Sequence, residues 1–176
     1  MSSISFHHLS LSPVLLGLRN AMHILQKGQS YASSSPNSPS SLLEARLHPD
    51  MANLIFQVQR FTDAAKFIPP RVNPSNPSIT LEDNETSFEE LIARVEKTIA
   101  YLEGIEEKSF EGREGEDIVM KTGGREMKFG AVEYVLTVAQ PNFWFHVTTM
   151  YGILRMKGVD VGKADFLRGK EGFPKA

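Results

Sequence analysis

The sequence feature that most constrains the fold is the segment 140–155, which is apolar on almost every side of a helix. Such a helix is buried on most of its faces. Three polar residues nonetheless fall at helical spacing along it and share one face: Asn142, His146 and Thr149. A histidine in apolar surroundings needs a partner, which we expect to be a core hydrogen bond, a metal or a ligand.

The size and composition of the chain narrow the class of protein. Its 176 residues suit a single domain, residues 1–176, with one hydrophobic core. The 19 basic and 21 acidic residues give a net charge of -2 without a basic cluster, which predicts no nucleic-acid partner. The absence of cysteine excludes disulfides and thiolate metal sites. With no signal peptide and no apolar run of about 20 residues, we expect a cytoplasmic protein without membrane contact.

Apolar positions with a 3.6-residue period predict four main helices. We expect them over residues 12–27, 49–67, 88–104 and 130–158, with a short helix over residues 41–47. Pro13 and Pro49 suit the first turns of the first two helices. Ser87 and Glu90 form a capping box before the third helix. Pro141 lacks a backbone donor and is expected to kink the last helix.

Loops and a hairpin are predicted between these helices. Residues 28–40 are rich in serine and proline and are expected to be a flexible loop. Residues 71–84 are expected to cross the bundle, and residues 169–176 to be a loose tail. Residues 117–121 and 125–129 flank Thr122-Gly123-Gly124, a pattern typical of a β-hairpin. The predicted fold is therefore all-α, a four-helix bundle with a small β-hairpin before the last helix.

The second predicted helix carries its own polar stripe, with Asp50, Asn53 and Gln57 on one face. Ligand and metal sites in bundles form where such stripes face each other. A carboxylate next to an imidazole fixes its tautomer and raises its basicity. We therefore predict that His146 and Asp50 are a catalytic pair, with His146 moving the proton. The predicted ligand contacts are Gln57, Asn142, Trp144, Thr149 and Tyr151.

Two other interpretations of these residues stay open. In a purely structural one, Asp50 caps the second helix and His146 donates to a backbone carbonyl. In a metal-binding one, His23, His48 and His146 converge through the tertiary fold, with nitrogen and oxygen ligands only. The sequence contains no phosphate loop and no nucleophile elbow that would indicate another chemistry.

Several segments resemble a domain-of-unknown-function family within the DinB-like helical-bundle superfamily. They are residues 47–51, 56–59, 82–88, 124–127, 158–163 and 165–167, together with the most specific one, Pro141-Asn142-Phe143-Trp144-Phe145-His146-Val147-Thr148-Thr149-Met150-Tyr151. The resemblance implies a four-helix bundle with a crossover, often dimeric. Relatives frequently hold a divalent metal through three histidines, including a His-x3-His pair on the last helix. Here Asn142 and Met150 stand four residues from His146, and this departure from the family pattern argues against the family's metal site.

Some relatives are encoded beside secondary-metabolite genes, and the resemblance therefore implies an isomerase or lyase of secondary metabolism. The leading hypothesis is a small-molecule-binding bundle that acts, without metal or cofactor, as an acid/base enzyme of isomerase, cyclase or dehydratase type on a small apolar metabolite. One alternative is a DinB-like divalent-metal-binding protein. The other is a non-catalytic homodimeric scaffold with Phe143, Trp144 and Phe145 at the subunit interface. The sequence leaves open whether the chain is an enzyme.

Overall fold

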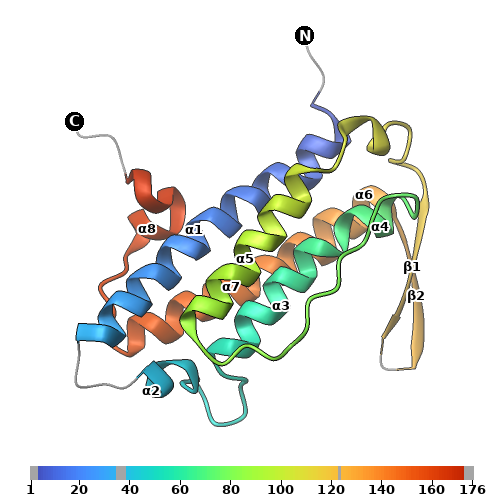
Figure 1. Ribbon diagram of the computed structural model, residues 1–176. Helices are drawn as coiled ribbons and strands as arrows, with labels where there is room; N and C mark the ends of the chain where they lie inside the picture. The colour runs from blue at the N-terminus through green and yellow to red at the C-terminus, as the bar shows by residue number, and fades with distance from the viewer. Residues whose placement is uncertain (1–3, 35–38, 123, 173–176) are drawn as a thin grey trace.

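The computed structural model describes residues 4–34, 39–122 and 124–172. Four long helices lie side by side: α1 (Phe6–Ser34), α3 (Leu54–Lys66), α5 (Phe88–Glu103) and α7 (Gln140–Met156) (Figure 1). The shorter elements are α2 (Pro39–Leu43), α4 (Ile68–Val72), η1 (Glu107–Phe110), β1 (Asp117–Thr122), β2 (Arg125–Gly130), α6 (Ala131–Glu133), η2 (Tyr134–Ala139), α8 (Lys163–Arg168) and η3 (Gly169–Glu171). The predicted all-α bundle with one hairpin is confirmed. No helix in the described part of the chain is long and apolar enough to cross a membrane.

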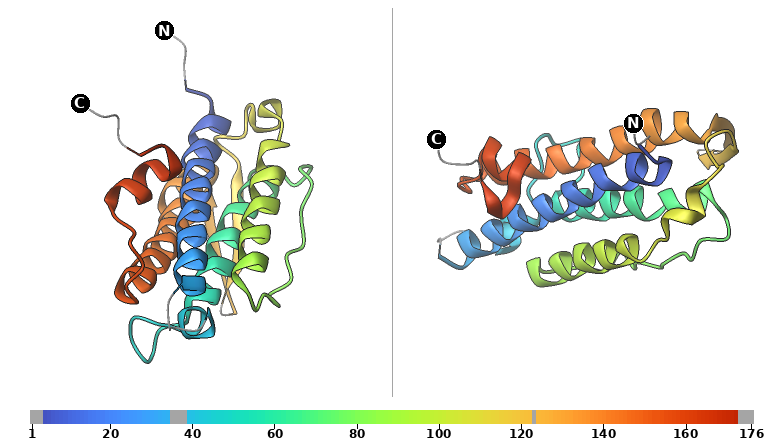
Figure 2. Two further views of the ribbon diagram at one scale, coloured as in Figure 1. Left: turned by 60° about the vertical axis from the view of Figure 1, so that its left-hand side comes forward. Right: turned by 90° about the horizontal axis from the view of Figure 1, so that it is seen from above.

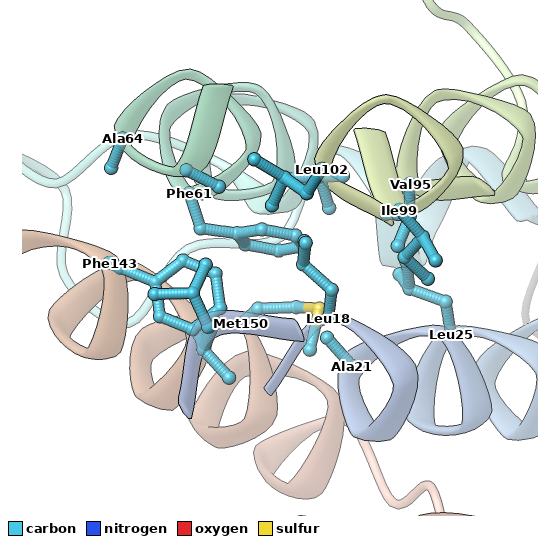
Figure 3. Packing of buried hydrophobic residues seen from close by; sticks show 14 of the residues in the cluster. Leu18, Ala21, Leu25, Phe61, Ala64, Val95, Ile99, Leu102, Phe143 and Met150 are labelled. Carbon is cyan, nitrogen blue, oxygen red and sulfur yellow. The ribbon is translucent and has the colours of Figure 1, made fainter. Parts of the chain in front are cut away.

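The core lies where the four long helices meet (Figure 3). Phe61 of α3 and Phe143 of α7 pack edge to face, with ring centroids 5.9 Å apart. The same cluster contains Leu18, Ala21 and Leu25 of α1, Ala64 of α3, Val95, Ile99 and Leu102 of α5, and Met150 of α7, with Leu25, Val95 and Ile99 farther along the bundle. These side chains come from segments far apart in the sequence and form one contiguous cluster.

Helices α3 and α5 run in the same direction, so the chain between them must return along the bundle (Figures 1 and 2). The predicted crossing over residues 71–84 is confirmed with shifted bounds: residues 73–87 make it, because α4 extends to Val72. Three hydrogen bonds pair the loop with α5 in reverse order: Tyr101 to the Pro77 carbonyl, Lys97 to the Thr80 carbonyl and Arg94 to the Glu82 carbonyl. Burial raises the pKa of Tyr101 to about 12, so its hydroxyl remains a donor.

A buried cation fastens this loop to α3 and α5. Nε of Arg94 donates to Oγ1 of Thr62 at 2.7 Å, and Nη1 donates to Glu85 at 2.8 Å. Its Nη2 lies 3.2 Å from a carboxylate oxygen of Asp63 and 3.0 Å from one of Asp83. Side chains from α3, α5 and the crossing loop thus meet at one guanidinium, which sequence analysis did not predict.

Two further cations complete the cluster. Lys66 contacts Asp63 at 2.7 Å, and Arg60 contacts Asp63 at 3.0 Å and also Asp83. The cluster therefore holds three cations and three carboxylates, which balance: Arg60, Lys66 and Arg94 against Asp63, Asp83 and Glu85. Buried charges are tolerated when they are paired and hydrogen-bonded in this way.

Helix α1 begins earlier than predicted, at Phe6 instead of Ser12, and Pro13 lies inside it. A proline in a helix interior deprives the carbonyl four residues earlier of its donor. Here that carbonyl belongs to Leu9, and Nε2 of Gln140 donates to it at 2.8 Å. A side chain from α7 thus replaces the missing backbone bond, which explains how the helix continues through the proline.

The same helix also ends later than predicted. Residues 28–34, expected to belong to a flexible loop, are helical, and residues 35–38 lie outside the described part of the chain. Gly28 is buried because α1 passes close to Phe88 and Leu154 there. The hydroxyls of Ser30, Ser33 and Ser34 each donate to the carbonyl four residues earlier. The short helix predicted over residues 41–47 is α2, which starts two residues earlier and ends at Leu43.

Local signals at α5 and the hairpin are confirmed. Ser87 and Glu90 form the predicted capping box, and Gly104 is the C-cap of α5. β1 and β2 pair antiparallel, and Ile118 anchors the hairpin in the core. The last helical segment begins with α6, passes through η2, which is π-helical, and continues as α7. A π-helical segment is a local departure from regular α-helical hydrogen bonding. Here it ends at Ala139, directly before the first turn of α7, which contains Pro141.

Candidate functional site

A hydrogen-bonded pair, Gln57 on α3 and His146 on α7, links these two helices. Asn53 fixes the start of α3, because its side chain accepts from the backbone N–H of Phe56 at 3.1 Å. Gln57 then lies one turn into the helix and is buried. Its Nε2 donates to the carbonyl of Ala52 at 3.0 Å, and its Oε1 lies 2.8 Å from Nδ1 of His146. Both ends of the buried amide are satisfied.

These contacts determine which nitrogen of His146 carries the proton. The carbonyl of Ala52 can only accept, so the NH2 group of Gln57 points towards it and Oε1 points towards the imidazole. Nδ1 of His146 therefore donates to Oε1, and Nε2 keeps its lone pair. Nε2 has no hydrogen-bond partner among the residues that the structure describes.

The surroundings of His146 favour its uncharged form. Burial lowers the pKa of His146 below its ordinary value of 6.5, and the positive charge of Arg60 lowers the pKa further. The neutral ring donates from Nδ1 and accepts at Nε2, whereas a protonated ring would donate from both nitrogens. At neutral pH His146 therefore offers a hydrogen-bond acceptor and proton acceptor at Nε2.

Two exposed aromatic rings flank His146. Phe145 is 57 % exposed and Phe56 is 40 % exposed. Their ring centroids lie 5.1 Å and 6.2 Å from that of the imidazole, both edge to face. The guanidinium of Arg60 lies over the Phe56 ring, 5.2 Å from its centroid. We call the surface formed by Phe56, Arg60, Phe145 and His146 the α3–α7 face.

Replacing Arg60 tests this electrostatic description. We expect Arg60→Gln to raise the pKa of His146 towards its ordinary value, because a nearby positive charge is removed while burial remains. An NMR titration of the His146 ring measures this pKa. The pKa of His146 is lower in the folded protein than in the unfolded chain, so below pH 6.5 the unfolded chain binds more protons than the folded protein. His146 therefore lowers the free energy of unfolding as the pH falls below 6.5. Arg155→Gln, at the exposed end of α7, is the matched control; equal His146 titrations in both variants would contradict the description.

The structure does not place Asp50 beside His146. Helix α3 begins at Leu54 instead of Pro49, so Asp50 lies in the loop before the helix, with its side chain 79 % exposed. Its carboxylate contacts Nδ1 of His48. The predicted pairing of Asp50 with His146 is therefore wrong, and the neutral amide of Gln57 occupies the place expected for a carboxylate.

Two predicted pocket walls lie on the other side of α7. Trp144 and Tyr151 pack against Phe166 of α8, with ring centroids 5.9 and 5.7 Å apart. Residues two and five positions from His146 point in other directions on a helix. Trp144 and Tyr151 therefore do not line the site around His146.

The polar stripe on α7 runs from solvent into the core. Asn142 is exposed, His146 is half-buried and Thr149 is buried. The hydroxyl of Thr149 donates to the carbonyl of Phe145 at 2.8 Å and is satisfied within the helix. The expectation of a helix buried on most sides is thus wrong for its outer face, which exposes Asn142 and Phe145.

The three histidines considered for a metal site lie apart. His23 contacts Asp165 of α8 at 2.9 Å, His48 contacts Asp50, and His146 contacts Gln57. Within the described ranges, no group of three histidine, aspartate or glutamate side chains is arranged to hold a metal ion. The convergence of His23, His48 and His146 that the sequence left open does not occur.

Sequence reasoning missed the aromatic and cationic parts of the α3–α7 face. Arg60 lies three residues after Gln57 and so on the same side of α3, a spacing that was available in the sequence. Phe56 was not predicted, because a phenylalanine on a mainly apolar helix is expected to point inward. Phe145 was expected at a surface only in the alternative of a homodimeric scaffold. Only the packing of α3 against α7 shows that both rings lie at the surface.

Comparison with known proteins gives a family and a fold. A family model described as a domain of unknown function (DUF1993) matches residues 6–167. Among solved structures, the chain is similar to a DinB family member protein from Shewanella denitrificans, with 33 % sequence identity and a TM-score of 0.84. The similarity covers 92 % of this chain and 90 % of that chain. No curated protein matches the chain.

Proposed function

Because the chain belongs to the DUF1993 family and has the DinB-like four-helix-bundle fold, we propose that it is a small-molecule-binding bundle whose ligand occupies the α3–α7 face. A shared fold does not specify an activity, so the proposal rests on the chemistry of this face. The observation that carries it is the hydrogen bond from Nδ1 of His146 to Oε1 of Gln57, which leaves Nε2 without a partner among residues 4–34, 39–122 and 124–172.

The surroundings of Nε2 indicate the class of ligand. Exposed phenyl rings leave apolar surface in contact with water, and a group of them is typical of a binding surface. Phe56 and Phe145 therefore favour a flat or apolar body. Nε2 of His146 accepts a hydrogen bond, so the same ligand should carry a hydroxyl or another donor. A small, largely apolar molecule with one donor group satisfies both requirements.

The same geometry supports acid/base chemistry. A neutral imidazole takes a proton from an acidic O–H or C–H group of a bound ligand, and then returns it to a different atom. Gln57 holds the ring and stabilises the Nδ1–H tautomer throughout. Proton removal and return of this kind is the shared step of isomerase, cyclase and dehydratase reactions. We assign this role to His146, with Gln57 as its positioning residue.

A pair of probe molecules tests the proposal. Phenol donates a hydrogen bond, whereas anisole has the same ring with a methyl group in place of the hydroxyl hydrogen. We expect phenol to bind the α3–α7 face roughly three- to tenfold more tightly than anisole, the value of one hydrogen bond. Chemical-shift titrations of the labelled protein measure both affinities and locate the site.

The control for this titration is His146→Phe, which keeps an aromatic ring and removes the acceptor. In this variant phenol and anisole should bind with equal affinity. Equal affinities in the unaltered protein, or shifts confined to residues away from Phe56, Phe145 and His146, would contradict the proposal.

A second candidate function is a homodimeric scaffold, which the exposure of Phe145 also favours. The interface expected from the sequence changes, because Phe143 is buried against Phe61 and Trp144 packs on Phe166. Only Phe145 of those three remains available to a second subunit. Light scattering separates the candidates: a dimer that Phe145→Ser converts to a monomer supports the scaffold, and a monomer at every concentration removes it.

A further inference from the structure

A cleft of about 650 Å³ lies between α1 and the C-terminal segment formed by α8 and η3, away from the α3–α7 face. Figure 2 shows this segment lying along α1. The cleft has a volume within the range of small-molecule sites. No residue of the α3–α7 face lines it, so it is a separate candidate site.

Contacts with Asn20 attach the C-terminal segment to α1. Nδ2 of Asn20 donates to the carbonyl of Phe166 at 3.0 Å. Gly169 is buried against Asn20 with φ +55°, where a Cβ atom would lie 2.6 Å from the amide oxygen. The expectation of a loose tail is therefore wrong for Gly169–Glu171, which form η3 on α1; residues 173–176 lie outside the described chain.

One wall of the cleft contains a fixed histidine. Nε2 of His23 donates to Asp165 at 2.9 Å, and Lys27 donates to the same oxygen at 3.0 Å. Burial raises the pKa of Asp165, but hydrogen bonds from the Gly162 N–H, Lys27 and His23 outweigh it and lower the pKa below its ordinary value. Asp165 therefore stays ionised, and the orientation of the His23 ring is set.

The lining of the cleft is positively charged although the chain as a whole is slightly acidic. Three cationic side chains line it, Arg19, Arg168 and Lys170, against one carboxylate, Glu171, a difference of two positive charges. Arg19 is already paired with Glu103. Nε of Arg168 donates to the Gly172 carbonyl at 3.3 Å, which leaves its two terminal nitrogens for an anion. Within the described ranges, no carboxylate lies within ion-pair distance of Arg168 or Lys170.

Apolar side chains lie beside these cations. Leu16 is 51 % exposed and Leu167 is 41 % exposed, one from each side of the cleft, and Met22 of α1 also lines it. Two exposed leucines in a concave site are a binding surface for an apolar group. The cleft thus combines an apolar lining with unpaired positive charge.

We propose that the cleft between α1 and α8–η3 binds a small amphiphilic anion, an apolar body that carries a carboxylate, sulfonate or phosphate group. Arg168 and Lys170 contact the anionic group, and Leu16, Met22 and Leu167 contact the apolar body. The Asn20 and Asp165 contacts hold the C-terminal segment in place, so the site exists before the ligand arrives and needs no rearrangement.

Two fluorescent probes that differ in charge test this proposal. The first is 8-anilinonaphthalene-1-sulfonate, and the second is N-phenyl-1-naphthylamine, which has the same rings without the sulfonate. We expect the sulfonate to bind at one site per chain and more tightly than the neutral amine. Its affinity should fall with added sodium chloride, whereas that of the amine should not.

Three variants locate the site. Arg168→Gln combined with Lys170→Gln, both exposed positions, should weaken sulfonate binding about tenfold and leave amine binding unchanged. Leu167→Ser should weaken binding of both probes. All titrations use the Phe145→Ser background, because both probes carry aromatic rings and an N–H donor and so also match the ligand class of the α3–α7 face. Lys121→Gln, which removes an exposed cation on β1, is the charge control and should change neither affinity. Equal affinities for the two probes, unchanged sulfonate binding in the double variant, or equal weakening in Lys121→Gln would overturn the proposal, and circular dichroism verifies that each variant is folded.

Discussion

Replacing Arg94 by methionine should destabilise the protein by about 3–5 kcal/mol, because it removes the cation that pairs with the largely buried Glu85 and leaves the cluster with one carboxylate in excess. The guanidinium donates to Thr62 and contacts Asp63, Asp83 and Glu85. Methionine has a similar helix propensity and an unbranched side chain, so the substitution removes the charge with little change in local preference. Urea unfolding followed by circular dichroism measures the free energy of unfolding.

The control for this substitution is Arg155→Met, at an ion pair on the surface of α7. Arg155 and Asp160 are 3.6 Å apart and exposed. Pairs of this kind contribute about 0–1 kcal/mol. We therefore expect Arg94→Met to lower the free energy of unfolding much more than Arg155→Met. The slope of the unfolding free energy with urea concentration should be the same in both variants. Similar losses from Arg94→Met and Arg155→Met would show that the buried cluster does not fasten the crossing loop.

Gly17→Ala should also lower the free energy of unfolding, because overpacking of the core costs about 1–3 kcal/mol. Helix α1 crosses α7 closely at this glycine. A Cβ atom there would lie 2.5 Å from Phe143 and 2.8 Å from Trp144, both ring atoms. Phe143 is fully buried and cannot move aside without disturbing Phe61. Because the ring in the way is fully buried, we expect overpacking in the upper part of this range, which exceeds the roughly 1 kcal/mol that alanine gains over glycine in a helix and leaves a net loss of about 1–2 kcal/mol.

Gly152→Ala is the matched control, the same substitution inside another long helix, and it should raise the free energy of unfolding. Gly152 lies inside α7, and a Cβ atom there would be 3.5 Å from Leu47, an ordinary contact. Alanine should therefore stabilise the protein by about 0.5–1 kcal/mol. Thermal and urea unfolding of both variants give the comparison. A Gly17→Ala protein as stable as the unaltered one would contradict the close crossing of α1 and α7.

The parts of the fold that local signals specify were predictable from the sequence. Ser87 and Glu90 act on each other across a single turn, and the hairpin depends on the turn beside it. The start of α1 at Phe6 was not predictable, because a helix cannot continue through Pro13 without loss unless the carbonyl of Leu9 finds another donor. That donor, Gln140, is 131 residues away in the sequence. A local pattern cannot include it.

The candidate site was predictable only in part for the same reason. Gln57 and His146 were predicted to face each other because each lies on a polar stripe of its helix. The position of Asp50 depended on where α3 begins. The helix begins after its N-cap, Asn53, and not at Pro49, so Asp50 lies outside it. The ion-pair cluster around Arg94 was partly predictable. Arg94 lies three residues after Leu91 and therefore on the apolar face of α5, where a cation needs buried partners.

The most direct test of the account is the state of the two ring nitrogens of His146. Long-range proton–nitrogen NMR spectra of protein with ¹⁵N-labelled histidine report which nitrogen is protonated at neutral pH. We expect the proton on Nδ1, donated to Gln57, and a bare Nε2 whose resonance moves when phenol is added and stays in place with anisole. A proton on Nε2 in the free protein, or an Nε2 resonance that saturating phenol leaves unchanged, would contradict the assignment of His146 as the ligand-binding base.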